Sequence, residues 1–166
     1  MTRIYSILTL ILVFFVLGCE QSTKQPSASL KENYQMEKKA ILKALLSETK
    51  AAFDRDYEEW KANWVHRPSI SKTYMNFADT TFSEMTSWKE IDDFVRIYIE
   101  EHPEPVPPPA QPENIHVKLY GTGAWVSYEI LDEVFGRKRE TRLMEKEKGR
   151  WKIAGMHTTI YGFNKK

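Results

Sequence analysis

The chain is predicted to have an α+β fold, with helices packed on one face of a curved sheet. Two observations support this prediction. Apolar residues recur every three or four positions in the first half of the chain, which is typical of amphipathic helices. The last third consists of strand-length segments joined by short turns that contain glycine, at residues 115–120, 124–134, 138–146 and 151–163. Four consecutive strands with such turns predict an antiparallel meander.

Two successive helices are expected in the first half of the chain. Ser29 with a glutamate three residues later has the spacing of a capping box, and an apolar stripe follows at residues 41–53. The charged residues 54–56 interrupt this stripe. Asp56 also has a glutamate three residues later, so a short second helix is expected to begin there. One long helix through the same span is the alternative.

A hairpin and a third helix are expected next. Pro68 ends the helical stretch, because the residue before a proline is driven towards extended conformations. Residues 70–75 and 80–85 mix β-branched and aromatic side chains and predict two short paired strands. Ser87 opens another capping box, and the helix that it begins must end near His102, since a proline follows.

Six of the eight prolines lie within residues 103–112. Such a run favours extended backbone without paired hydrogen bonds, so it predicts a stiff surface loop. A recognition site for a proline-binding domain is the alternative.

Cys19 is the only cysteine in the sequence, so it cannot form an intrachain disulfide. It follows Arg3 and an apolar run at residues 7–17, as in a secretory signal. This run is too short to span about 30 Å of hydrocarbon, which needs roughly 20 residues. The tetrapeptide Val-Leu-Gly-Cys at residues 16–19 resembles a bacterial lipobox, which implies cleavage before Cys19 and lipid on its thiol and new amino group.

The lipobox resemblance divides the chain into a signal peptide at residues 1–18, a polar flexible tether at residues 19–30 and a single domain at residues 31–166. The expected location is the bacterial cell envelope, periplasmic or surface-exposed, with the membrane as a partner through the lipid on Cys19. An ordinary secreted protein with an unpaired cysteine is the alternative.

Composition argues against several classes of partner. Without residues 1–18 the chain has 23 basic and 23 acidic side chains, and this neutral balance gives no attraction to nucleic acid. The histidines are scattered, so no metal site is predicted, and no glycine-rich phosphate loop suggests a cofactor.

The five Trp, eight Tyr and eight Phe indicate a well-filled core or, as the alternative, an aromatic-lined pocket.

Four segments resemble the nuclear transport factor 2-like superfamily, in particular its polyketide-cyclase-like (SnoaL-like) branch. They are residues 53–64, 87–91, 123–128 and 145–153, of which the last, a charged turn with glycine before Trp-Lys-Ile, is the most characteristic. The resemblance implies a cone in which three N-terminal helices wrap a strongly curved antiparallel sheet of about six strands. It also implies a pocket at the wide end and, frequently, a homodimer through the open sheet face.

Aromatic and ionisable side chains supply the candidate pocket residues, which are Trp60, Trp64, His66, Tyr74, Trp88, Tyr98, Tyr128, Arg142 and His157. His66 and His157 are the best catalytic candidates, because histidine titrates near neutral pH. His157 has the same parity as Trp151 and Ile153 on the final strand, so it is expected to point into the cone. A structural role is the alternative for both histidines. Arg142 is expected to face an anionic ligand or to be a solvated strand residue in an ion pair.

Three functions fit these features. The first is a lipid-anchored module that binds a small apolar or amphipathic ligand without chemistry. The second is an interaction or dimerisation module that uses the open sheet face around Trp125. The third is an isomerase, cyclase or dehydratase that uses a pocket His or Tyr. The base and the oxyanion donors of such enzymes cannot be assigned residue by residue here, so enzymatic activity stays open.

Overall fold

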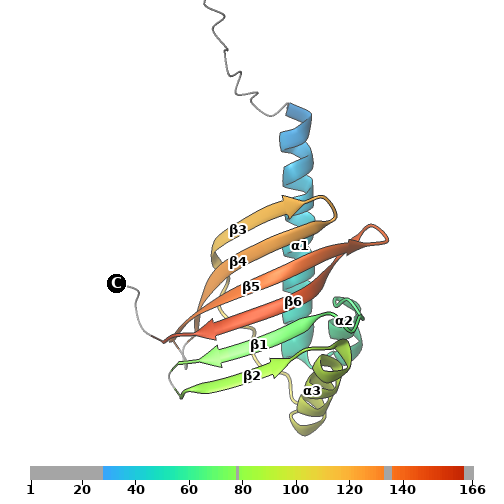
Figure 1. Cartoon of the computed structure of the whole chain (residues 1–166). Helices are drawn as coiled ribbons and strands as arrows, with labels where there is room; N and C mark the ends of the chain where they lie inside the picture. Colours follow the sequence, from blue (N-terminus) through green and yellow to red (C-terminus); the bar gives the residue numbers. More distant parts are fainter. Residues whose placement is uncertain (1–27, 78, 133–135, 163–166) are drawn as a thin grey trace, which may run out of the picture.

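Three helices and six strands make up the described part of the chain, residues 28–77, 79–132 and 136–162 of a computed structural model (Figure 1). The helices are α1 (Ala28–Asp54), α2 (Tyr57–Ala62) and α3 (Trp88–Glu101). The strands are β1 (Ser71–Asn76), β2 (Thr81–Met85), β3 (Glu113–Tyr120), β4 (Gly123–Asp132), β5 (Gly136–Glu147) and β6 (Arg150–Ile160). The predicted signal peptide, Cys19 and most of the predicted tether lie outside the described residues.

One mixed sheet has the strand order β2-β1-β6-β5-β4-β3, and the helices lie on one side of it (Figure 1). The hairpin β1–β2 and the meander from β3 to β6 are antiparallel, which confirms the predicted α+β class. Among the strands of the described residues, β1 and β6 are the one pair that runs in parallel, so the sheet is not antiparallel throughout. This pairing joins the hairpin to the last strand of the meander, although the two are far apart in the sequence. No local sequence signal predicts that the two strands run in parallel.

The helix boundaries follow the local signals in two of three cases. The side chain of Asp56 accepts a hydrogen bond from Glu59 N at 3.0 Å and caps α2, so the alternative of one long helix is wrong. Ser87 Oγ accepts from Glu90 N at 3.3 Å and caps α3 as predicted. Ala28 and Ser29 already belong to α1, inside the span predicted as tether, so Ser29 lies within the helix and is not its N-cap.

The proline-rich segment between α3 and β3 contains no helix or strand, as predicted. It is tied to the end of α1, because Val106 N donates to Phe53 O at 3.0 Å. Within the described ranges, no helix combines the length and apolar character needed to cross a membrane.

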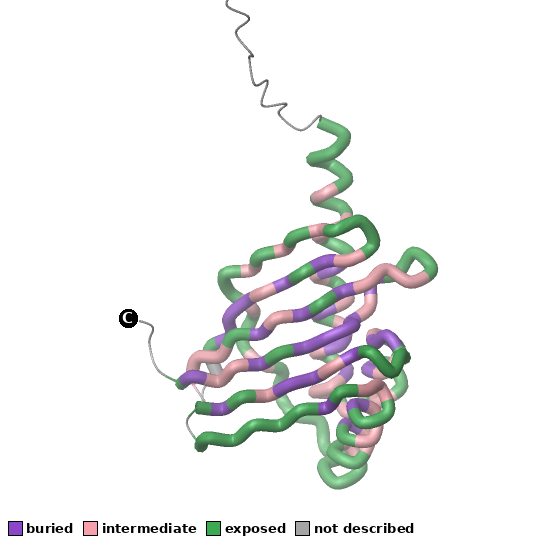
Figure 2. The backbone as a smooth tube through the Cα atoms, in the orientation of Figure 1, coloured by how far each residue is buried: buried purple, intermediate pink, exposed green. Residues whose placement is uncertain are grey.

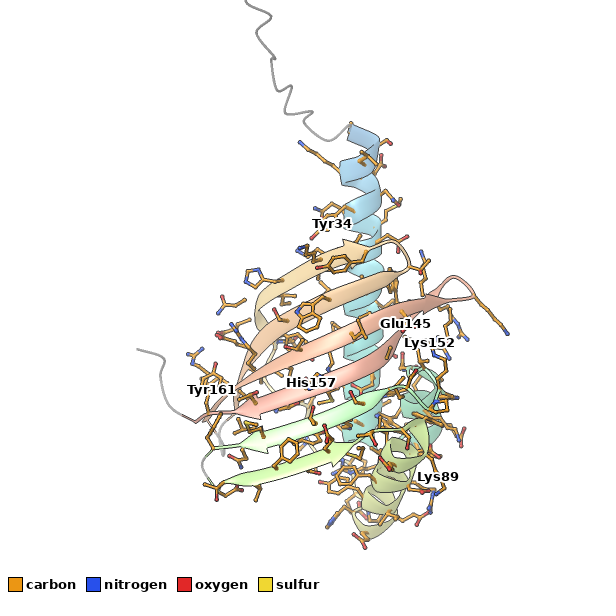
Figure 3. All side chains as sticks on the ribbon, viewed as in Figure 1. Tyr34, Lys89, Glu145, Lys152, His157 and Tyr161 are labelled. Atoms are coloured by element: carbon orange, nitrogen blue, oxygen red, sulfur yellow. The ribbon has the colours of Figure 1, made fainter. Side chains whose placement is uncertain are left out.

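A β-bulge on β6 reverses which side chains face the helices. Leu143 pairs with Gly155 and Met144 with Ile153, so Ala154 is an extra residue on β6. One inserted residue moves every later side chain to the opposite face. The expectation that His157 points into the cone is therefore wrong. Its side chain is exposed on the face turned away from α1, as Figure 3 shows.

The core fills the space between α1, α2 and the inner sheet face. Its largest fully buried side chains include Ile41 of α1, Trp60 of α2 and Met144 and Ile153 of the sheet. Buried positions alternate with less buried ones along the middle of β5 and the first half of β4, as Figure 2 shows, because successive strand residues point to opposite faces. On β6 the four residues 153–156 around the bulge are all buried.

Candidate functional site

A cavity of about 460 Å³ lies between the inner sheet face and the helices α1 and α3. Its wall is mostly apolar, and the side chains that form it include Phe53, Phe94, Tyr98, Ile99, Ile130 and Met156. A volume of this size is within the range of small-molecule sites, which are about 300–1,000 Å³. The cavity therefore has room for a ligand of modest size.

The sheet register places charged and polar side chains side by side on the floor of this cavity. Lys72 on β1 is level with Met156 on β6, which is level with Arg142 on β5. The neighbouring row, which is one pleat further along the strands, contains Tyr74, Thr158, Glu140 and Tyr128. Both rows face the helices, since alternate residues of a strand share a face.

Glu48 of α1 closes the floor from the helix side. It is buried, and its Oε1 accepts hydrogen bonds from the indole Nε1 of Trp60 at 3.0 Å and of Trp64 at 3.1 Å. Its Oε2 lies 3.7 Å from Nη2 of Arg142. A buried carboxylate needs such partners, because an isolated charge loses its hydration when it is buried.

Arg142, Glu140 and Tyr128 form a buried network. Arg142 donates from Nη2 to Glu140 Oε2 at 2.7 Å and from Nε to the Tyr128 hydroxyl at 3.2 Å. The Tyr128 hydroxyl donates to the same Glu140 oxygen at 2.7 Å. Every member of this network thus stabilises the ionised form of Glu140.

The pKa values of the network follow from these contacts. Burial would raise the pKa of Glu140, but the charge of Arg142 and the hydrogen bond from Tyr128 outweigh it and hold the pKa below its usual range. Burial raises the pKa of the Tyr128 phenol well above its usual value, so the phenol stays protonated. Burial would lower the pKa of Arg142, but Tyr128, Glu140 and Glu48 outweigh it and keep the guanidinium charged.

Three solved structures with the same arrangement of helices and strands identify the fold. A cystatin-like fold protein from Burkholderia xenovorans is 19% identical, with a TM-score of 0.60 over 75% of this chain and 92% of that one. A candidate scytalone dehydratase from Novosphingobium aromaticivorans is 16% identical, with a TM-score of 0.58 over 81% and 93% of the chains. A candidate dehydratase of the nuclear transport factor 2-like family from Streptomyces avermitilis is 13% identical, with a TM-score of 0.59 over 76% and 97%.

The chain has the nuclear transport factor 2-like fold. No protein-family model and no curated protein sequence matches it. At these identities the likeness shows the fold alone, and a nuclear transport factor 2-like fold houses binding modules as well as enzymes. The function must therefore be argued from the site.

The cavity contains part of the predicted pocket set. Trp60, Tyr74, Tyr98 and Arg142 line it. Trp64 and Tyr128 are buried beside it and reach its floor through Glu48 and Glu140. The remaining predicted residues, Trp88, His66 and His157, do not line this cavity.

Both catalytic candidates lie outside the cavity. The His66 ring is exposed and stacks on Trp88 at a centroid distance of 4.1 Å, and its Nε2 is 2.9 Å from Lys61 O. His157 contacts the hydroxyl of Thr73 on the opposite face of the sheet. Within the described ranges, no group of three or more His, Cys, Asp and Glu side chains is placed to hold a metal ion.

Sequence reasoning missed four polar residues of the floor, Glu48, Lys72, Glu140 and Thr158. Two of them had a signal. Glu48 is an acidic residue at an apolar-stripe position, three residues after Leu45. Glu140 shares the parity of Arg142 on its strand. Thr158 was hidden by the bulge, which reversed its predicted face.

Proposed function

We propose that this chain is a lipid-anchored protein of the bacterial cell envelope whose cavity binds a small amphipathic molecule without transforming it. One observation carries the proposal: a cavity of about 460 Å³ that combines an apolar wall with a charged floor. The wall suits an apolar body, and the floor suits a polar end that fixes its orientation.

The pairing of the ionised floor groups favours binding over catalysis. A general base works best when its pKa lies near the operating pH. The pKa of Glu140 is instead held below its usual range, and Glu48 already accepts two indole hydrogen bonds. Glu140 is therefore not poised to take a proton from a bound molecule, and the oxygens of Glu48 already face donors of the protein itself.

A cavity-filling variant tests the binding proposal. Ala52 lines the cavity, so Ala52→Phe should fill it, whereas Ala62→Phe adds the same ring at an exposed position on α2. A thermal-shift panel of aromatic and alkyl acids, alcohols and amines should raise the Tm of the wild type and of Ala62→Phe, but not that of Ala52→Phe. The proposal fails if no panel member raises the Tm of the wild type, or if Ala52→Phe responds equally.

Recovery of the bound compound tests whether chemistry occurs. Mass spectrometry of a panel member after long incubation should return it unchanged. Conversion by the wild type that is lost in Ala52→Phe would establish the enzymatic alternative, in line with the two neighbours that are candidate dehydratases.

The membrane anchor is tested at Cys19. Expression in a bacterial host should place the wild type in the membrane fraction with a lipid-modified N-terminal cysteine, and Cys19→Ser should leave it without lipid. A wild type that is recovered without lipid would contradict this part of the proposal.

Dimerisation is the second candidate function, with another copy of this chain bound to the outer sheet face. Trp125 on β4 and Leu143 on β5 are cross-strand neighbours that are 50% and 43% exposed. Met75 and Phe82 form a similar exposed pair on β1 and β2. Burial of such side chains in a dimer would remove apolar surface from water. Analytical ultracentrifugation should show a dimer that Trp125→Glu dissociates; a monomeric wild type would contradict it.

A further inference from the structure

The floor of the cavity contains donors that the fold itself leaves unused, and they point to the class of ligand. We infer that the floor is an anion subsite, in which Arg142, Lys72 and Thr158 bind the carboxylate of a monocarboxylic acid with an aromatic or alkyl body. This inference rests on the proposed binding function, and it adds the chemistry of the ligand's polar end.

Arg142 supplies a spare donor. Arg142 is 3% exposed, and its Nε and Nη2 donate to the Tyr128 hydroxyl and to Glu140, respectively. Its Nη1 is buried and has no hydrogen-bond partner. Buried donors in folded proteins are normally paired, so an unpaired guanidinium nitrogen on a residue that lines a cavity is explained by a ligand that accepts from it.

Lys72 supplies a second cation, held by aromatic rings and not by an acid. Lys72 is 5% exposed, and its Nζ lies 5.5 Å from the ring centroid of Trp64 and 5.4 Å from that of Tyr74. No carboxylate among the described residues lies within 4.0 Å of it, which leaves it without the ion pair that a buried ammonium group usually has. Aromatic faces stabilise this charge but do not neutralise it.

Thr158 supplies a third donor on the same face, one pleat away from the row that contains the two cations. It lies on β6, the strand between Lys72 on β1 and Arg142 on β5, and it is 3% exposed. Its Oγ1 is buried and has no hydrogen-bond partner. Neighbouring strands are about 4.8 Å apart, so the backbones of Lys72 and Arg142 are roughly 10 Å apart on one face of the sheet. Both side chains are long enough to reach the oxygens of a single carboxylate from there.

The overall charge of the lining agrees with an anionic ligand. Four basic and two acidic residues line the cavity, a formal net charge of +2, and these are Arg55, Lys72, Lys138, Arg142, Glu48 and Glu140. Both acids contact Arg142. A ligand carboxylate would therefore be attracted by the site as a whole, whereas an ammonium ligand would be repelled.

The apolar wall sets the other end of the ligand. Phe53, Phe94 and Tyr98 contribute rings to the cavity on the helix side, opposite the sheet floor. Aromatic side chains favour flat or extended apolar groups. A phenylalkanoic acid or a medium-chain fatty acid matches both ends.

Calorimetry on the full-length protein tests the inference with two pairs of probes, 4-phenylbutyrate with its amide and decanoate with its amide. The acids should bind at least about tenfold more tightly than the amides. Lys72→Met and Thr158→Val keep the side-chain volume nearly constant, and each should weaken the acids several-fold while leaving the amides unchanged. Lys118→Met, at an exposed position of β3, is the matched control and should change neither.

The possible results separate this inference from the binding proposal. Equal affinity for acid and amide, or equal weakening of both by Lys72→Met and Thr158→Val, would overturn the anion subsite and leave the binding cavity in place. Binding of neither acid nor amide would overturn the subsite for this ligand class, and the broader thermal-shift panel would then decide the binding proposal. Circular dichroism of each variant establishes that it is folded.

Discussion

Arg142 Nη2 lies 2.7 Å from Glu140 Oε2, although the two residues are next-but-one neighbours on the same strand. Residues two apart on a strand point to the same face, and here that face is the buried one. The pair is therefore inside the protein, where an unpaired charge is far more costly than in water. This geometry keeps both groups ionised and makes the floor of the cavity a fixed array of charges.

Removal of the Glu48 carboxylate should destabilise the fold strongly. Glu48→Ala leaves two buried indole donors unpaired and takes an acid away from Arg142, so the free energy of unfolding should fall by about 3–5 kcal/mol. Glu48→Gln is the control, because its amide oxygen can still accept from both indoles; it should lose only about 1–2 kcal/mol. Urea unfolding of the three proteins measures this, and equal losses would contradict the role assigned to the indole hydrogen bonds.

The ionised state of Glu140 should make stability depend on pH in the acidic range. Its folded-state pKa is depressed, because the charge of Arg142 and the Tyr128 hydrogen bond outweigh the effect of burial. The stabilisation is therefore fully present above the unfolded-state pKa of about 4.3, and it is lost as the pH falls through the lower folded-state value. Glu140→Gln cannot ionise, so it should be less stable than the wild type at pH 7.

The difference in unfolding free energy between the wild type and Glu140→Gln should narrow as the pH is lowered from 5 towards 2. Urea unfolding at several pH values measures it. A difference that stays constant over this range would mean that Glu140 is not held ionised in the folded state.

A side chain at Gly136 should lower the stability of the fold. Gly136 has a φ of 74°, and a Cβ there would lie 2.8 Å from Gly162 O. Gly121 has a similar φ of 61°, but a Cβ there would meet nothing within 4 Å. Gly121→Ala should therefore cost about 1 kcal/mol from backbone strain alone, and Gly136→Ala clearly more, at least about 2 kcal/mol. Thermal unfolding compares them, and equal losses would contradict the close approach.

The two histidines should be dispensable for ligand binding. His157→Ala removes a side chain from the outer sheet face, and His66→Ala removes an exposed ring that stacks on Trp88. Neither variant should change the affinity of a cavity probe by more than about twofold, since surface substitutions are usually small in effect. A loss of binding in His157→Ala would mean that the ligand occupies the outer face and not the cavity.

The helices and turns could be predicted from the sequence because their signals are local. The caps at Asp56 and Ser87 act on amide groups three residues away, and the meander is specified by short turns between neighbouring strands. Arg142 was among the candidate pocket residues, and it lines the cavity and is buried, so its alternative as a solvated strand residue is wrong.

Three features were decided only by the tertiary structure. The parallel pairing of β1 with β6 joins segments about 80 residues apart, the bulge at Ala154 reverses the faces of His157 and Thr158, and Glu48 reaches Arg142 from a different element. The β1–β6 pairing and the Glu48 contact join distant segments, and the bulge is an extra residue opposite the neighbouring strand β5. In all three cases packing decides the outcome, and the residues next to each position along the chain do not. The sequence by itself thus determined which segments form helices and strands, and most of the apolar side chains that face the core. The folded chain decided which charges meet on the floor of the cavity, because a buried charge must find its partner wherever the fold brings one.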